Sequence, residues 1–104
     1  MILVNTDYVT GREIVATMGL VRGNTVKATH MGKDIMAGFR NLTGGTVKEY
    51  VDMLTQAREE AVNEMVFKAQ QMGADAVINV RFMTSSVMQS AAEVMVYGTA
   101  VKLK

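Results

Sequence analysis

Apolar residues alternate with their neighbours along residues 13–28, and this period of two is typical of a β-strand. Gly19 and Gly23 interrupt the pattern. A glycine inside a strand commonly marks a bulge or a close approach of another backbone. Because Arg22-Gly23-Asn24 also suits a tight turn, the alternative is a strand that bends or ends at this point.

A longer period follows, because apolar residues recur every three or four positions from 47 to 72 and predict a long helix. Thr46 and Glu49 predict a capping box at its start, and Gly73 predicts a left-handed stop at its end. Val62 and Val66 lie beside the stripe, which indicates that another subunit covers that side. The stripe itself consists of Val47, Tyr50, Leu54, Ala57, Ala61, Met65, Ala69 and Met72.

Two further alternating segments, 75–86 and 91–103, are separated by a few residues and predict an antiparallel hairpin. Gly98 and Ala100 are small enough to let the helix backbone approach closely. We expect one face of the first segment to carry Ala76, Ile78, Val80 and Phe82. We expect its other face to carry Val77, Asn79, Arg81 and Met83.

The segment between the first strand and the long helix is ambiguous. Ile35, Phe39 and Leu42 recur at the spacing of a short helix, which Gly44-Gly45 would end. Much of the unusual polar chemistry of the chain lies in this segment, namely His30, Lys33, Asp34, Arg40 and Asn41.

These elements predict an α+β fold of order β-α-β-β in one domain, residues 1–104. A right-handed crossover gives a three-stranded antiparallel sheet, order 1-3-2, packed on the long helix, with a short extra helix. The other sheet face would then be uncovered, and we expect it to carry Val77, Met83, Met95, Tyr97 and Val101. An uncovered apolar face and two free sheet edges predict association of several copies.

Composition narrows the chemistry further. The net charge of +1 gives no support for nucleic-acid or membrane-surface binding. The chain has no cysteine and one histidine, which excludes thiolate metal sites and a site with several histidines from one chain. No apolar run approaches the length of a membrane span, and no basic leader precedes the first apolar residues, so we expect a cytoplasmic protein. No catalytic constellation is recognisable, so we expect no enzymatic activity, and no cofactor is indicated.

Three groups of residues are candidates for binding. Near a hairpin centred at Val87-Met88, Arg81 would lie close to Glu93, and Asn79 close to Tyr97, opposite the helix. This group either fixes a contact between subunits or lines a ligand pocket between them. The second group is Asp34 and Arg40 with Asn41, which either form a bridge or face a ligand. The third group is Gly44, Gly45 and Thr46, which either form a turn or hold an anion.

A soft metal ion is a further candidate ligand, because thioethers and imidazole bind such ions. The available donors are His30, Met83, Met88 and Met95. Methionine also fills gaps in cores and interfaces, so packing is the alternative explanation for these side chains.

Several motifs together resemble the YbjQ family, which is labelled heavy-metal-binding. They are Gly32-Lys33-Asp34-Ile35-Met36-Ala37-Gly38-Phe39-Arg40-Asn41, Gly44-Gly45, Lys48-Glu49-Tyr50, Ala57-Arg58-Glu59-Glu60-Ala61, Gly73-Ala74-Asp75-Ala76-Val77, Asn79-Val80-Arg81-Phe82, and Glu93 with Tyr97-Gly98-Thr99-Ala100-Val101. The resemblance covers nearly the whole chain and implies a dodecin-like subunit in a ring-shaped pentamer, with no settled activity. We therefore expect a homo-oligomer that binds a small ligand between subunits; the alternatives are a soft-metal-binding protein and a purely structural ring.

Overall fold

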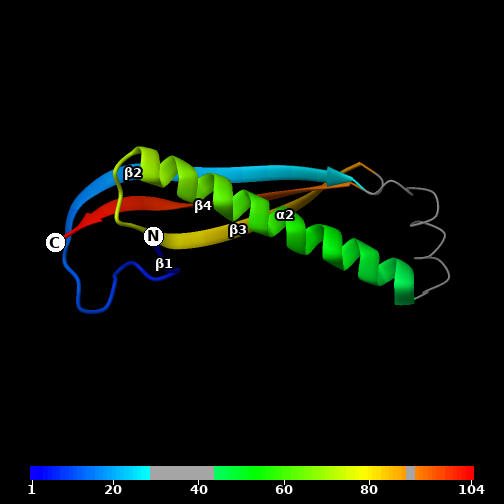
Figure 1. The fold of residues 1–104 in the computed structure, drawn as a ribbon, viewed down its shortest axis with the longest axis horizontal. Coiled ribbons are helices and arrows are strands. Elements are labelled where there is room, and N and C mark those ends of the chain that lie inside the picture. The colour runs from blue at the N-terminus through cyan, green and yellow to red at the C-terminus, as the bar shows by residue number, and fades with distance from the viewer. Residues whose placement is uncertain (29–43, 89–90) are drawn as a thin grey trace.

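The computed structural model describes residues 1–28, 44–88 and 91–104, with the backbone alone at 44–47. Its elements are β1 (Ile2–Leu3), β2 (Ile14–Ala28), α2 (Gly44–Gln71), β3 (Ala76–Met88) and β4 (Ala91–Leu103). The strands form one sheet of order β1-β3-β4-β2, and α2 crosses one face of it obliquely (Figure 1). We call this the helix face and the opposite side the outer face.

The α+β class is confirmed, but the predicted three-stranded antiparallel sheet is wrong. Residues 2 and 3 add a fourth strand, which runs parallel to β3 through the pairs Ile2–Ala76 and Leu3–Val77. A two-residue strand is too short to leave a recognisable alternation in the sequence. The predicted extra helix falls within residues 29–43, outside the described residues.

The chain is elongated, with extents of 54 × 22 × 16 Å and a radius of gyration of 17.0 Å. A compact domain of this length would have a radius of gyration of about 13 Å. The elongation arises because a 28-residue helix and a 15-residue strand run along the same long axis (Figure 1). Such a shape buries less apolar surface per residue than a compact one does.

Both ends of α2 can be compared with the prediction. The helix begins at Gly44, so Thr46 lies in its first turn and the predicted cap position is wrong. Gly44 and Gly45 are the first two residues of α2, although glycine is a poor helix former, so they open this helix. The predicted stop is confirmed: Gly73 has φ +80, its N–H donates to the Gln70 carbonyl, and the Ala74 N–H donates to the Ala69 carbonyl.

Glycines also shape the contact between β2 and α2. Gly19 has φ +123 and stands where the register between β2 and β4 shifts, which is the predicted bulge. A Cβ on Gly23 would meet the Ala61 carbonyl and, at 2.7 Å, the Met65 nitrogen, so the helix backbone approaches closest here. The strand continues past Gly23 to Ala28, and the alternative of a tight turn is wrong.

Gly98 was expected to let the helix backbone approach closely, and this prediction is wrong. A Cβ at this position would lie 2.6 Å from Cγ1 of Val77 and 2.8 Å from the Ile78 carbonyl, so Gly98 makes room for β3 and not for the helix. Residues 79 and 80 form a bulge opposite it, with Asn79 at φ +54 and its N–H donating to the Thr6 carbonyl. The extra residue reverses the alternation along β3.

This bulge corrects the predicted faces of β3. Val77 and Val80 both pack toward α2, whereas Ile78 lies on the outer face with the partner pair Arg81 and Tyr97. Strict alternation had placed Val77 with Arg81, and it failed because the strand carries one residue more than its partner between these positions.

The core has one part on each face of the sheet. The larger part lies between α2 and the helix face and comprises Val21, Ala57, Ala61, Met65, Ala69, Val77, Val94, Val96 and Ala100. On the outer face, the N-terminal segment covers Ala76, Ile78, Val101 and Leu103 with Ile2, Val4, Val9 and Ile14. The prediction of an uncovered outer face is therefore wrong at this end, which we call the covered end.

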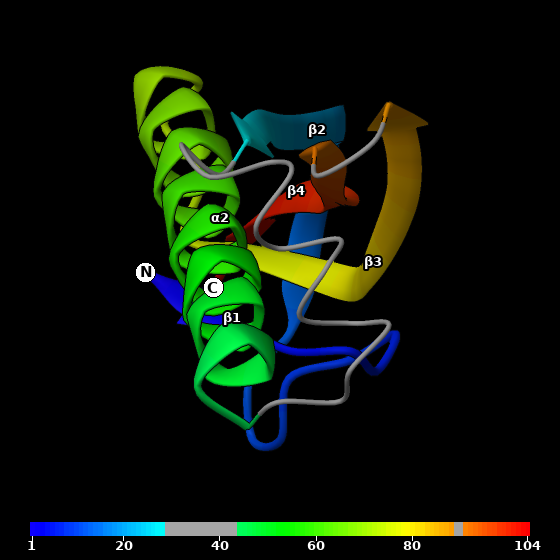
Figure 2. The same cartoon turned by 90° about the vertical axis from the view of Figure 1, so that its right-hand side faces the viewer.

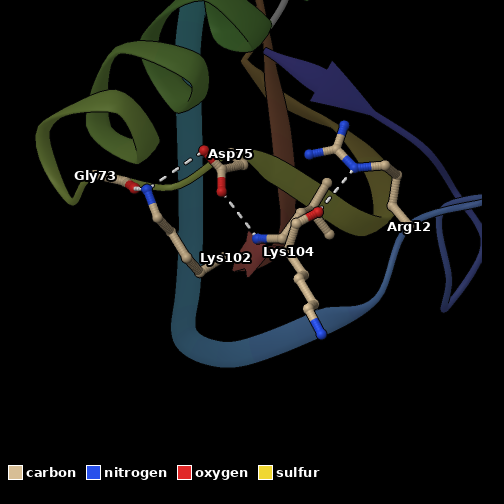
Figure 3. A network of polar contacts seen from close by, with 6 residues as sticks. Arg12, Gly73, Asp75, Lys102 and Lys104 are labelled. Carbon is tan, nitrogen blue, oxygen red and sulfur yellow. Dashed lines mark hydrogen bonds and ion pairs between the residues drawn. The ribbon is translucent and has the colours of Figure 1, made fainter.

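Polar contacts fasten the covered end (Figure 3). Lys102 Nζ donates to the Gly73 carbonyl at 3.1 Å and lies 3.4 Å from Oδ1 of Asp75, whose Oδ2 accepts the Leu103 N–H at 2.9 Å. The Leu103 amide, with help from Lys102, lowers the pKa of the Asp75 carboxyl below its ordinary value, although desolvation acts in the opposite direction. The end of the helix is thereby joined to the last strand.

Candidate functional site

The outer face is not covered by the N-terminal segment where β3 continues past its bulge. We call this the open end: residues 81–88 of β3 with the strands beside them. Every residue from Arg81 to Met88 is exposed, in contrast to the buried Ala76–Ile78 of the same strand. In the end-on view, α2 lies on one side of the curved sheet, away from this half of β3 (Figure 2).

Three side chains form a row across the open end. Tyr97 of β4 lies between Arg22 of β2 and Arg81 of β3 in the strand register. Neighbouring strands are about 4.8 Å apart, so the three residues are close enough to act on one ligand. Tyr97 is half-buried, and both arginines are exposed. Within the described residues neither arginine makes an ion pair.

The predicted pairing of Arg81 with Glu93 is wrong. The strands of the hairpin meet at the pair Met88–Ala91, beyond the predicted centre, and this moves the partner of Arg81 from Glu93 to Tyr97. Nη1 of Arg81 donates to the Asn5 carbonyl at 2.9 Å and to the Val80 carbonyl at 3.1 Å.

Asn79 and Glu93 therefore have other neighbours than predicted. Asn79 lies in the bulge and does not face Tyr97. Glu93 pairs in register with Ser85, and its Oε2 accepts a hydrogen bond from Asn24 Nδ2 at 3.2 Å. Of the predicted group, the structure brings Arg81 and Tyr97 together and leaves Asn79 and Glu93 outside that row.

Sequence reasoning missed Arg22 and Asn24, which β2 contributes to the open end. Their position on the outer face follows from the alternation that predicted the strand. Val21 and Gly23, which flank Arg22 in the sequence, face the helix, so Arg22 and Asn24 face the opposite side. The missing information was that β2 pairs with β4 along its whole length, which aligns Arg22 with Tyr97 and Asn24 with Met95.

Two thioethers also meet on this face. Met83 and Met95 are direct cross-strand partners, with Asn24 on the other side of Met95. Met88 lies five residues further along β3, about 16 Å away at the usual rise, so it cannot share an ion with Met83. His30 lies outside the described residues. No group of three or more His, Asp or Glu side chains in the described ranges is placed to hold a metal ion.

The remaining candidates lie elsewhere. Asp34, Arg40 and Asn41 belong to residues 29–43 and fall outside the described part of the chain. Gly44, Gly45 and Thr46 form the first turn of α2. Lys48 follows shortly after them and is exposed, and its Nζ lies 3.8 Å from Oδ2 of Asp52. In the part of the chain that the structure describes, no helix is long and apolar enough to cross a membrane.

Comparison with known proteins gives matches over the full chain. A family model described as "Putative heavy-metal-binding" matches residues 1–104. The chain is 57% identical over 103 residues to a UPF0145 protein of Methanosarcina acetivorans, covering 99% of this chain and 97% of the relative. It is 53% identical over 103 residues to a UPF0145 protein of Photobacterium profundum, covering 99% of this chain and 100% of the relative.

A solved structure has the same fold. It is a protein of unknown function from Pediococcus pentosaceus, with a TM-score of 0.72 and 18% sequence identity, covering 100% of this chain and 98% of the other. At this identity the likeness supports the fold alone.

Proposed function

The chain belongs to the YbjQ family, whose model it matches over its full length, and we propose that it forms a closed homo-oligomeric ring that binds a small ligand between its subunits. The row of Arg22, Tyr97 and Arg81 on the open end carries this proposal. The resemblance described above implies five subunits.

Exposed apolar side chains support the ring. Phe82, Met83, Val87 and Met88 are all exposed at the open end, although a small subunit gains much of its stability by burying such groups. The elongated shape leaves this half of β3 without cover from α2 or the N-terminal segment. Copies of the chain that cover one another would remove these side chains from water and close without a free end.

The chemistry of the row favours an anionic ligand. Guanidinium groups bind carboxylate and phosphate oxygens through paired N–H donors, and the Tyr97 hydroxyl is a further donor. Met83 and Met95 form the next row and offer an adaptable apolar contact. We therefore propose a small carboxylate or phosphate compound with an apolar part, held where a neighbouring subunit limits the access of water.

Native mass spectrometry of the protein as purified tests both parts. We expect a mass near five times 11.3 kDa plus a retained organic mass. Arg81→Met should lose the retained mass and keep the ring, whereas the control Arg12→Met, which changes an arginine of the covered end, should keep both. An 11.3 kDa monomer at micromolar concentration contradicts the ring. A ring with no retained mass, and no uptake of small aryl carboxylates or phosphates, contradicts the ligand.

The pair Met83–Met95 supports a second candidate, a soft metal ion. Thioether sulfur selects ions such as Cu(I), and His30, the single histidine of the chain, is a further donor. Titration with Cu(I) against a competing chelator should show binding that Met83→Leu with Met95→Leu abolishes. Met72→Leu, at the end of α2, is the matched control. Unchanged binding in the double variant contradicts this candidate.

A further inference from the structure

We propose that neighbouring subunits meet through two unlike surfaces on opposite flanks of α2, each occupied by a second copy of this chain. The groove is lined by Leu3, Glu59, Val62, Val80 and Phe82. The edge patch consists of Leu20, Arg22, Phe67 and Met72. This inference rests on the proposed ring and names the surfaces that would build it.

The groove exists because α2 packs on β2 and β4 and leaves β3 uncovered beyond its bulge. Two adjoining cavities of about 550 and 530 Å³ both contact Val62 and Phe82, so they form one continuous depression. Phe82 is 50% exposed, although it lies on the same face of β3 as the packed Val80. The groove is large enough to accept an aromatic side chain from outside.

The edge patch lies at the opposite side of the sheet. β2 is the outermost strand there, and a cavity of about 350 Å³ separates it from the last turns of α2. Leu20 is 66% exposed and Phe67 is 59% exposed. Two large apolar side chains thus reach solvent beside a strand whose outer edge has no partner within the described residues.

The geometry of α2 places these surfaces on different flanks. Val62 and Phe67 are five residues apart, which corresponds to about 140° around a helix. That arc faces away from the sheet, and the remaining arc of about 220° contains the buried stripe of Ala57, Ala61 and Met65, which contacts the sheet. Because the groove and the patch are unlike and face different directions, a contact between them is head-to-tail, and repetition of such a contact closes a ring when the rotation permits.

Charge complementarity favours a second copy as the occupant. Glu59 lines the groove and Arg22 lines the edge patch, and neither belongs to an ion pair in the described part of the chain. Arg58 also lines the groove, where it donates to Thr55 Oγ1 at 3.2 Å. Docking the patch into the groove would bring Arg22 of one copy to Glu59 of the next.

Two single variants test this arrangement. Phe67→Glu disables the patch and leaves the groove, and Phe82→Glu does the reverse. Because both sites are half-exposed, we expect both variants to fold, which circular dichroism would check. We expect each variant alone to be an 11.3 kDa monomer, and their equimolar mixture to form a dimer and nothing larger. Rings that persist in both variants overturn the proposed surfaces and leave the proposed ring intact. A monomeric wild-type protein overturns both.

A cross-link gives an independent measurement, because the chain has no cysteine of its own. The double variant Phe67→Cys, Phe82→Cys should give a ladder of disulfide-linked multimers on mild oxidation. The control Val15→Cys, Phe82→Cys, with a similarly exposed site on β2, should give no ladder. Equal ladders from both pairs overturn the proposed contact.

A charge reversal tests the ion pair. Arg22→Glu and Glu59→Arg should each raise the dissociation constant of the ring at least tenfold, and the double variant should recover most of the loss. A double variant that assembles no better than the single ones overturns the pairing.

Discussion

The two ends of the sheet differ in how much of their core one chain supplies. At the covered end, Ala76–Ile78 of β3 are buried between α2 on one face and the N-terminal segment on the other. At the open end, Arg81–Met88 of the same strand are exposed throughout. The boundary is the bulge at residues 79 and 80.

Continuous strand pairing does not require a continuous core. β4 pairs with β2 on one side and with β3 on the other from Ala91 to Val101, apart from Gly98 opposite the bulge, yet apolar cover stops at this bulge of β3. The candidate ligand row and the groove both lie next to this boundary. Beyond the bulge, β3 therefore leaves side chains exposed at positions where the packed half of the same strand buries them.

The largest expected difference between the ends is in the free energy of unfolding that is lost when one apolar side chain at each end is truncated. Ile78 and Met83 both lie on the outer face of β3, and they are 7% and 49% exposed. Ile78→Ala should lower the free energy of unfolding by about 2–5 kcal/mol because it leaves a cavity. Met83→Ala should cost about 0.5 kcal/mol or less at low protein concentration. Urea denaturation measures both, and equal losses would contradict the distinction between the ends.

The next largest loss of stability is expected from disturbing the close contact between α2 and β2 at Gly23. Gly23→Ala places a Cβ against the Ala61 carbonyl and the Met65 nitrogen, and neither backbone atom can move without shifting the helix. We expect a loss of about 1–3 kcal/mol, the usual cost of overpacking. Thr25→Ala, two residues along the same face, is the control and should cost much less. A neutral Gly23→Ala variant would show that the helix is not held at this point.

A smaller effect is expected where the helix ends at the covered end. Gly73→Val forces a branched residue into φ +80, and we expect a loss of about 1–2 kcal/mol. Gly73→Asn should lose less because asparagine adopts this conformation more readily. Thermal melts of the two variants provide the measurement. A Gly73→Val variant that melts with the wild type would disprove the strain at this position.

The smallest expected effect is the contribution of Asp75 to stability, which depends on pH. Because the folded pKa of Asp75 lies below its ordinary value of 3.8, the carboxylate stabilises the fold above that value, and the contribution is lost as pH falls through the folded pKa. Asp75→Asn should therefore melt below the wild type near neutral pH and match it in strong acid. Asp52→Asn, on the exposed side of α2, is the control. A gap between Asp75→Asn and the wild type that does not close in acid would contradict this role.

Much of the secondary structure could be predicted because it depends on local spacing. The predicted strands at 13–28 and 91–103 match β2 and β4 closely, and the stop at Gly73 is where the helix ends. Even the bulge at Gly19 followed from a glycine within a strand pattern. Each of these features is stabilised by neighbours in the chain, so the pattern that encodes it is short enough to recognise.

The candidate site could be predicted only in part. Arg81 and Tyr97 were placed on the same face, but their direct pairing depends on the bulge at residues 79 and 80 and on the position of the turn. Arg22 entered the row because β2 pairs with β4 over its full length. A shift of one residue in register moves every side chain of a strand to the other face, so small local errors change the composition of a site completely.

The amino-acid sequence by itself determined the periods, the helix stop and the excess of apolar residues beyond one helix face, because each depends on residues within a few turns or strand positions. Only the tertiary structure decided which face each residue of β3 occupies and what covers it. The N-terminal segment carries no strong period, yet it closes one end of the outer face by packing with residues that are about 60 to 100 positions away. Pairing at such separations is selected by the packing of the whole chain, and for that reason it leaves no local pattern in the sequence.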